Sequence, residues 1–331
     1  MSGIVLTDNA RGGANLLNVG NDARGVMTPD EALEKAGLNF TVELRQCKTE
    51  DGNLMEGIAG NQYTVRTDNN QVLGNGLSKG YGIVQNQTVA DTIIEICGHA
   101  DATIERIGSR KNGASMFCIA RLPQEYSVMV GTEDPAQVYM IFQNSHDGSG
   151  SLKITFTSIR LHCFNQMPAM LKEGTQIKLS HTSGINKNLF SKIDNVLVAV
   201  RESIETLEVS YNQMLDTKID REKAIDLIDY LIGSKMGMYK NADGEKVLKY
   251  SGKHESQRNK IIENLDHESN NVDNMRGTVW AVYNAYTYFI DHQRTLNSTT
   301  GELKPEGREN AIFNDGRRKR ERAVVRCLEV C

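Results

Sequence analysis

The hydrophobic periodicity of this chain changes near residue 185, and that change limits what the chain can fold into. From Phe40 to about Thr182, apolar residues alternate with polar ones or form short blocks, as they do in β-strands. After Gly184 they recur every three or four residues, as they do along one face of a helix. The pattern predicts an α+β fold, in which an antiparallel sheet with packed helices is followed by a long helix and a helical C-terminal region.

We therefore expect three segments along the 331 residues. Residues 1–27 are rich in Gly and Asn and are predicted to form a flexible N-terminal segment. Residues 28–185 are predicted to form the sheet domain, which opens with a capped helix at Thr28-Pro29. Residues 186–331 are predicted to form a helical region that ends in a basic helix. The polar N-terminus does not match a secretory signal, and no apolar run reaches the roughly 20 residues of a membrane span, so we expect a cytoplasmic protein.

Two apolar patterns make finer predictions. In the strand predicted at 151–163, the alternation changes phase at Thr157-Ser158, which indicates a β-bulge. In the long helix, the apolar positions are spaced like a coiled-coil seam, and this seam could pack on the chain's own sheet or on a neighbouring subunit. The seam residues are Leu189, Ile193, Val196, Val200, Ile204, Leu207, Tyr211 and Met214.

The charge balance excludes a uniformly basic nucleic-acid binder, because 38 basic residues face 42 acidic ones. It does not exclude binding through a local basic strip, in which basic side chains contact phosphates and an aromatic ring stacks on a base. The alternative is an ordinary solvated sheet face. The candidate contacts in the strand-rich half are Lys79, Tyr81, Arg106, Arg110, Lys111, Arg121, Lys153, Arg160 and Lys178. A denser run in the C-terminal helix consists of Arg317, Arg318, Lys319 and Arg320.

A histidine loop, residues 144–150, is the other candidate for chemistry. His146 and Asp147 lie side by side there, and together with His162 and His181 they could hold zinc or manganese or form an acid–base pair. The alternative is a hairpin loop whose turn Asp147 stabilises through its own backbone. None of the six cysteines forms a CxxC pair, and no Walker loop or nucleophile elbow is present. We expect no metal and no cofactor.

Several longer strings resemble a phage- and plasmid-type family of domains of unknown function. They are Asn144–Ser149, Ile159–Gln166, Leu179–Thr182, Gly277–Ala285 and the closing Lys319–Leu328 helix. The chain departs from that family at His162-Cys163 and at Ser180. The order of strands and helices is also similar to the annealing proteins typified by the eukaryotic Rad fifty-two protein. The resemblance implies a role in phage replication, recombination or counter-defence, inside the host cell.

The leading hypothesis is a phage-type protein that binds single-stranded DNA and anneals complementary strands as a homo-oligomer, in a ring or filament. It requires no covalent catalysis, so the chain is more readily a binding protein than an enzyme. Phage replication or recombination proteins are further expected partners, and a membrane is not. Two alternatives remain open. One is a metal-dependent phosphodiesterase or nuclease that uses the histidine loop, and the other is a counter-defence protein that binds a host partner.

Overall fold

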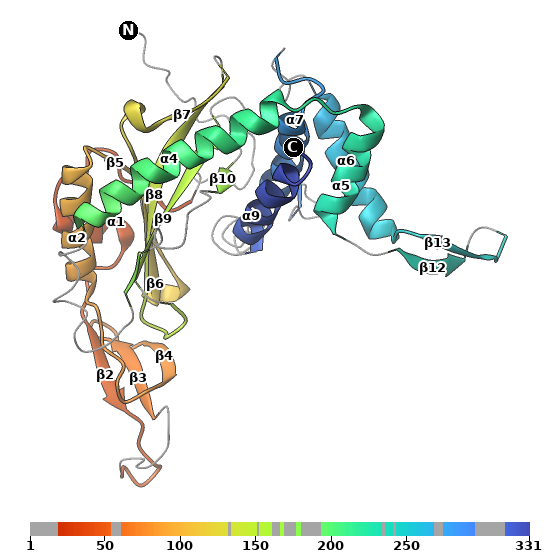
Figure 1. Cartoon of the computed structure of the whole chain (residues 1–331). Coiled ribbons are helices and arrows are strands. Elements are labelled where there is room, and N and C mark those ends of the chain that lie inside the picture. The colour runs from red at the N-terminus through yellow and green to blue at the C-terminus, as the bar shows by residue number, and fades with distance from the viewer. Residues whose placement is uncertain are drawn as a thin grey trace.

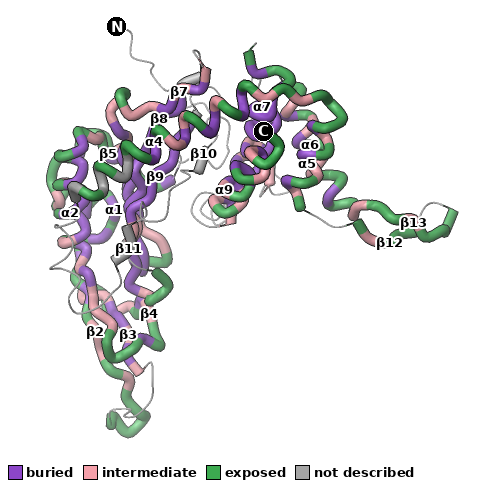
Figure 2. The backbone as a smooth tube through the Cα atoms, viewed as in Figure 1, coloured by how far each residue is buried: buried purple, intermediate pink, exposed green. Residues whose placement is uncertain are grey.

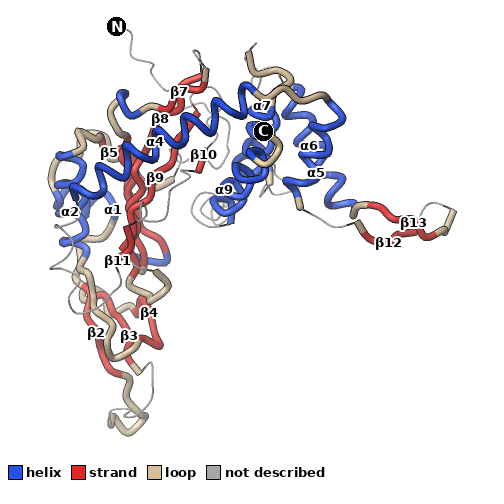
Figure 3. Tube along the Cα trace, in the orientation of Figure 1, coloured by secondary structure: helices blue, strands red, loops and turns tan. Residues whose placement is uncertain are grey.

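The computed structural model describes residues 19–53, 61–131, 134–150, 152–160, 166–168, 177–179, 193–233, 236–240, 243–267, 274–294 and 315–331. Within these residues the protein is α+β, as the sequence predicts, and its strands pair antiparallel. The two larger sheets come first along the chain, and the part that follows is mainly helical and carries one two-stranded sheet (Figures 1 and 3).

The main sheet has the strand order β1-β5-β6-β8-β9-β10, with β7 also paired to β8 and β11 also paired to β9. Its strands are β1 (Asn21–Asp22), β5 (Thr103–Arg110), β6 (Ser115–Arg121), β7 (Val128–Val130), β8 (Asp134–Ser145), β9 (Leu152–Arg160), β10 (Gln166–Pro168) and β11 (Ile177–Leu179). Residues 19–27 were predicted to be flexible, but here β1 pairs with β5 and Ala23 is fully buried. The rest of the predicted flexible segment, residues 1–18, lies outside the described residues.

A smaller sheet of three strands extends from one end of the main sheet (Figure 1). It contains β2 (Val42–Gln46), β3 (Gln62–Arg66) and β4 (Val72–Leu77). Two helices, α1 (Pro29–Ala36) and α2 (Asn86–His99), pack together beside the main sheet. The predicted cap of α1 is present as a capping box. The Thr28 hydroxyl accepts a hydrogen bond from the Glu31 N–H, and the Glu31 carboxylate accepts one from the Thr28 N–H. Short helical turns occupy η2 (Lys111–Gly113) and η3 (Gln124–Tyr126).

Strand β9 does not contain the predicted bulge. It pairs with β8 in unbroken register from Ala136–Arg160 to Gln143–Lys153. Its described side chains from Ile154 to Ile159 are all buried, on both faces. A strand buried on both faces shows no reliable alternation, so the phase change in the sequence reflects this environment. Without a bulge, Lys153 and Arg160 are at positions of β9 that belong to opposite faces.

The long helix α4 (Ile193–Asp216) joins the sheets to the helical half (Figure 1). Four seam residues in its described part are buried within the same chain: Ile204, Leu207, Tyr211 and Met214. They pack against β7 on the sheet side and against two helices of the C-terminal half. For this part of the seam, the choice left open by the sequence is resolved in favour of packing inside the chain.

The helical half consists of α5 (Arg221–Ile232), α6 (Gly252–Asp266), α7 (Val279–Tyr288), the π-helical turn η6 (Phe289–Gln293) and α9 (Asp315–Leu328). A two-stranded ribbon, β12 (Gly237–Lys240) and β13 (Lys246–Lys249), extends from it, within the region that was predicted to be helical. One cluster of buried residues includes side chains from the main sheet, from α4 and from these helices. Figure 2 marks the buried segments of each. None of the described helices combines the length and apolar character needed to cross a bilayer.

Candidate nucleic-acid interface

A β-bulge at Glu105 decides which basic residues of the β5–β6 hairpin share a face. The register steps from Ile104–Ala120 directly to Arg106–Ile119, so Glu105 is the extra residue of β5. An extra residue reverses the alternation of the residues that follow it. Arg106, and Arg110 four residues later, therefore lie on the face of Ile119 rather than on the face of Ile104.

The same face continues across the sheet. Phe117 is the register partner of Gln143, which pairs in turn with Lys153. On its other side, Lys153 is the register partner of Lys178 in β11. Since residues two apart on a strand share a face, Arg121 belongs to it as well. The register thus gathers five predicted basic contacts on one face of the main sheet: Arg106, Arg110, Arg121, Lys153 and Lys178.

The centre of this face is apolar and closed. Ile119 and Tyr139 are buried, whereas Arg106, Arg110 and Lys153 are partly exposed. Burial raises the pKa of the Tyr139 hydroxyl well above its usual value, and the nearby Glu105 carboxylate raises it further. The partly exposed basic residues therefore surround a buried apolar middle.

Two of the predicted cations are neutralised by carboxylates. The Arg121 Nε lies 2.8 Å from the Glu105 Oε1, and the Lys111 Nζ lies 2.7 Å from the Asp147 Oδ2. The Arg110 guanidinium lies 5.9 Å from the centre of the Phe117 ring, within the range of a weak cation–π contact. Each pairing with a carboxylate competes with any phosphate that approaches the same side chain.

The histidine loop connects the main sheet to the three-stranded sheet through a hydrogen bond and close backbone packing. His146 is buried, and its Nε2 lies 2.8 Å from the Asn86 Oδ1. Its backbone carbonyl accepts a 2.6 Å hydrogen bond from the Thr64 hydroxyl of β3. A Cβ added at Gly74 would lie 2.4 Å from the Asp147 Cα, so β4 crosses the loop at a point where only glycine fits.

Asp147 stabilises its own turn, as the hairpin alternative predicts. Its carboxylate accepts a 2.9 Å hydrogen bond from the backbone N–H of Ser149 and another from the Ser149 hydroxyl. Burial opposes ionisation of Asp147, but the Lys111 ammonium and the Ser149 donors outweigh it, so that the pKa of Asp147 is lowered. The described residues contain no group of three or more His, Cys, Asp or Glu that could hold a metal. His162 and His181 lie outside the described residues.

Tyr81 is not an open stacking platform in this structure. It is half-buried, and its hydroxyl donates a 3.3 Å hydrogen bond to the Ser145 carbonyl. Burial, followed by the charge of Asp147, raises its pKa above the usual value. Lys79, two residues earlier, is exposed at the same junction of the two sheets. The side chains of Arg160 and Lys178 lie outside the described part of the structure.

The basic run of the C-terminal helix is divided among different environments. Arg318 is exposed, and Arg317 forms an ion pair with Glu321 at 2.7 Å. Arg320 is completely buried and forms an ion pair with Asp291, which is also buried. The prediction that Arg320 contacts phosphate is therefore wrong for this structure, because a helix turns by about 100° per residue and directs this position into the core.

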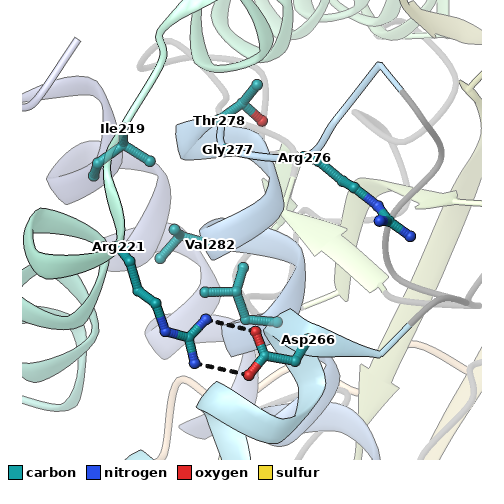
Figure 4. A pocket seen from close by; sticks show the side chains of 9 residues that line it. Ile219, Arg221, Asp266, Arg276, Gly277, Thr278 and Val282 are labelled. Atoms are coloured by element: carbon teal, nitrogen blue, oxygen red, sulfur yellow. Dashed lines mark hydrogen bonds and ion pairs between the residues drawn. The ribbon is translucent and has the colours of Figure 1, made fainter.

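A hollow of about 250 Å³ lies between α5, α6 and the start of α7 (Figure 4). The guanidinium of Arg221 forms two hydrogen bonds, of 2.6 and 2.8 Å, with the Asp266 carboxylate at one side. In Figure 4, the side chain of Arg276 points away from that pair. The lining offers charge and a helix N-terminus at Thr278, but no nucleophile paired with a base.

Sequence reasoning missed two basic features. Arg66 connects the two sheets, since its guanidinium donates to the Asn112 carbonyl at 2.8 Å and lies 3.8 Å from the centre of the Phe40 ring. The lysines of the β12–β13 ribbon are the second. Asp243-Gly244 between two alternating segments is a strong hairpin signal and could have revealed that ribbon.

The family model for a domain of unknown function, DUF932, matches residues 75–325 of the chain, which is well over half of its length. No curated protein matches the sequence. No solved structure matches it.

Proposed function

The chain belongs to the DUF932 family, whose description assigns no activity, and on that premise we propose that it binds single-stranded DNA and anneals complementary strands as a phage-type homo-oligomer. The observation that carries the proposal is the sheet register. It places Arg106, Arg110 and Lys153 on one face, beside the exposed Lys79 and Lys111 of the sheet junction.

The proposed mechanism is electrostatic. Basic side chains around the closed centre of the face neutralise phosphates, and each contact releases a condensed counterion. The bases are then left unpaired and available to a complementary strand. Phosphate contacts carry no base information, so binding should depend little on sequence. The likeness to Rad fifty-two type annealing proteins belongs to this proposal and suggests a ring or filament as the working assembly.

Replacing Arg110 and Lys111 together by Ala tests the proposal. If both side chains contact phosphate, the slope of log K against log salt should become less steep by roughly one to one and a half units, at about 0.7 per contact. Binding of fluorescent single-stranded oligonucleotides, measured by anisotropy over a salt series, gives the slope. The matched control removes two exposed lysines from α5 and α6, Lys223→Ala with Lys260→Ala, and should leave the slope unchanged.

Asp147→Asn provides a test in the opposite direction. The variant keeps the acceptor for Ser149 but removes the charge that holds Lys111. If Lys111 contacts phosphate, single-stranded DNA should bind more tightly at low salt, because the competing carboxylate has gone. Two results together would exclude the sheet junction from the binding site. They are a folded Arg110–Lys111 double variant with the slope and affinity of the wild type, and an Asp147→Asn variant that binds single-stranded DNA no more tightly than the wild type.

A further inference from the structure

The β12–β13 ribbon extends from the helical half and is exposed over most of its surface (Figures 1 and 2). Its register pairs Met238 with Leu248 and Lys240 with Lys246. Residues 238 and 240 share a face, as do 246 and 248, so both pairs lie on the same side of the ribbon. This side, which we call the ribbon face, consists of Met238, Lys240, Lys246 and Leu248.

The ribbon face is unfavourable in water in two ways. Met238 and Leu248 are 62% and 63% exposed, so an apolar cross-strand pair faces solvent. Lys240 and Lys246 are exposed and directly opposite each other, and like charges in that position destabilise a strand pair. A two-stranded ribbon is also only marginally stable by itself. A polyanion with a groove would relieve both conditions, because its phosphates neutralise the lysines and its groove removes the apolar pair from water.

The root of the ribbon is firmly held. Tyr250 directly follows β13, and its ring stacks on the His254 ring at a centroid distance of 3.8 Å. His254 is buried, and its Nε2 lies 2.8 Å from the Asp229 Oδ1 of α5. Ser251 caps α6 by accepting from the His254 N–H. These contacts fix the direction in which the ribbon leaves the helical half.

Positive charge continues from the ribbon towards the C-terminal helix. Lys249 and Lys253 are exposed at the root, and Arg322 is exposed on α9. Burial lowers the pKa of Lys319, and the neighbouring charges of Arg294, Arg322 and Lys253 lower it further. Exposed basic side chains therefore lie both at the root of the ribbon and on α9.

We propose that the ribbon face binds a groove of double-stranded DNA, with Lys240 and Lys246 on the phosphates and Met238 and Leu248 against the groove wall or a base step. A two-stranded β-ribbon fits the major groove. Minor-groove proteins commonly insert Met or Leu between base steps. The proposal concerns a different surface and a different form of DNA from the single-strand interface, so it does not depend on that interface.

The test measures binding of a short fluorescent DNA duplex over a salt series. Lys240→Ala with Lys246→Ala should flatten the slope of log K against log salt by about 1.8 units, at about 0.9 per phosphate. Met238→Ser with Leu248→Ser should weaken binding about tenfold or more at every salt concentration, with the slope unchanged. The Lys223–Lys260 double variant is the matched control and should bind as the wild type does. Unaltered thermal unfolding verifies that each variant is folded.

The Arg110–Lys111 double variant separates this proposal from the single-strand function. It should bind the duplex as tightly as the wild type, whatever its effect on single strands. Absence of duplex binding at low salt, or a wild-type slope in the Lys240–Lys246 variant, would overturn the proposal. If the Met238–Leu248 variant instead changes the oligomeric state in light scattering and leaves duplex binding intact, the ribbon face is an interface between copies of the chain and not a DNA contact.

Discussion

At the scale of single residues, the position of a charge along the sequence says little about its availability. Arg318 and Arg320 are two residues apart in one basic run, yet the first is exposed and the second is completely buried against Asp291. Lys111 is exposed but forms an ion pair with Asp147, which is 36 residues away in the sequence. Such partners come from distant parts of the chain, so a list of basic residues overestimates the surface that can attract phosphate.

The Lys111–Asp147 pair predicts a specific pH dependence. The pKa of Asp147 is lowered in the folded protein, so its contribution to stability is present above the unfolded pKa of about 3.9 and is lost as the pH falls through the folded value. Asp147→Asn should therefore lower the free energy of unfolding by about 1 kcal/mol or less at neutral pH. This difference from the wild type should shrink below about pH 4.

Urea unfolding at a series of pH values measures that difference. Lys111→Ala provides the matched variant, because it removes the ammonium but leaves the Ser149 donors, and its deficit should shrink at acidic pH in the same direction with a smaller amplitude. A deficit in Asp147→Asn that stays constant from neutral to acidic pH would mean that the carboxylate does not titrate through this pair in solution.

At the scale of elements, the sequence predicts correctly those features that depend only on neighbouring residues, such as a helix cap. The capped helix predicted at Thr28-Pro29 is present. The bulge was predicted in β9 but occurs in β5, where nothing in the sequence around Glu105 marks it. A bulge is defined by the partner strand, and β9 is buried on both faces, so neither fact can be obtained from one strand's own alternation.

We expect substitutions on two faces of the helix α4 to change the free energy of unfolding by very different amounts. Ile204 is 9% exposed, so Ile204→Asp should lower the free energy of unfolding by about 3 kcal/mol or more, because it places a carboxylate in the core. Val209 is 70% exposed, and Val209→Asp should change it by no more than about 0.5 kcal/mol. Urea unfolding measures both. A stable, folded Ile204→Asp protein that has lost its oligomeric state would instead assign this part of the seam to a subunit contact.

At the scale of the whole molecule, the change in periodicity near residue 185 marks a change of element type but not a break in the core. The buried cluster continues from the sheet through α4 to the helical half. The sequence indicates both halves and most basic positions of the candidate site. It cannot indicate that the Thr64 hydroxyl binds the His146 carbonyl, since 82 residues separate them. The joining of the two sheets, and with it the geometry of the site, is set by such long-range contacts.

The continuous core predicts that both halves unfold together. Trp280, the only tryptophan, is fully buried in the helical half, whereas Cys97 of α2 and Cys118 of β6 are buried in the sheet half. Arg320→Met removes the guanidinium that neutralises the buried Asp291 and should lower the free energy of unfolding by about 3–5 kcal/mol. The urea midpoint of this variant should therefore fall by the same amount with both probes of unfolding. One probe is Trp280 fluorescence, and the other is labelling of the Cys97 and Cys118 thiols, with the labelled sites assigned by mass spectrometry. If instead the fluorescence midpoint falls alone while Cys97 and Cys118 remain protected, the chain contains two separately unfolding domains with a boundary near residue 185.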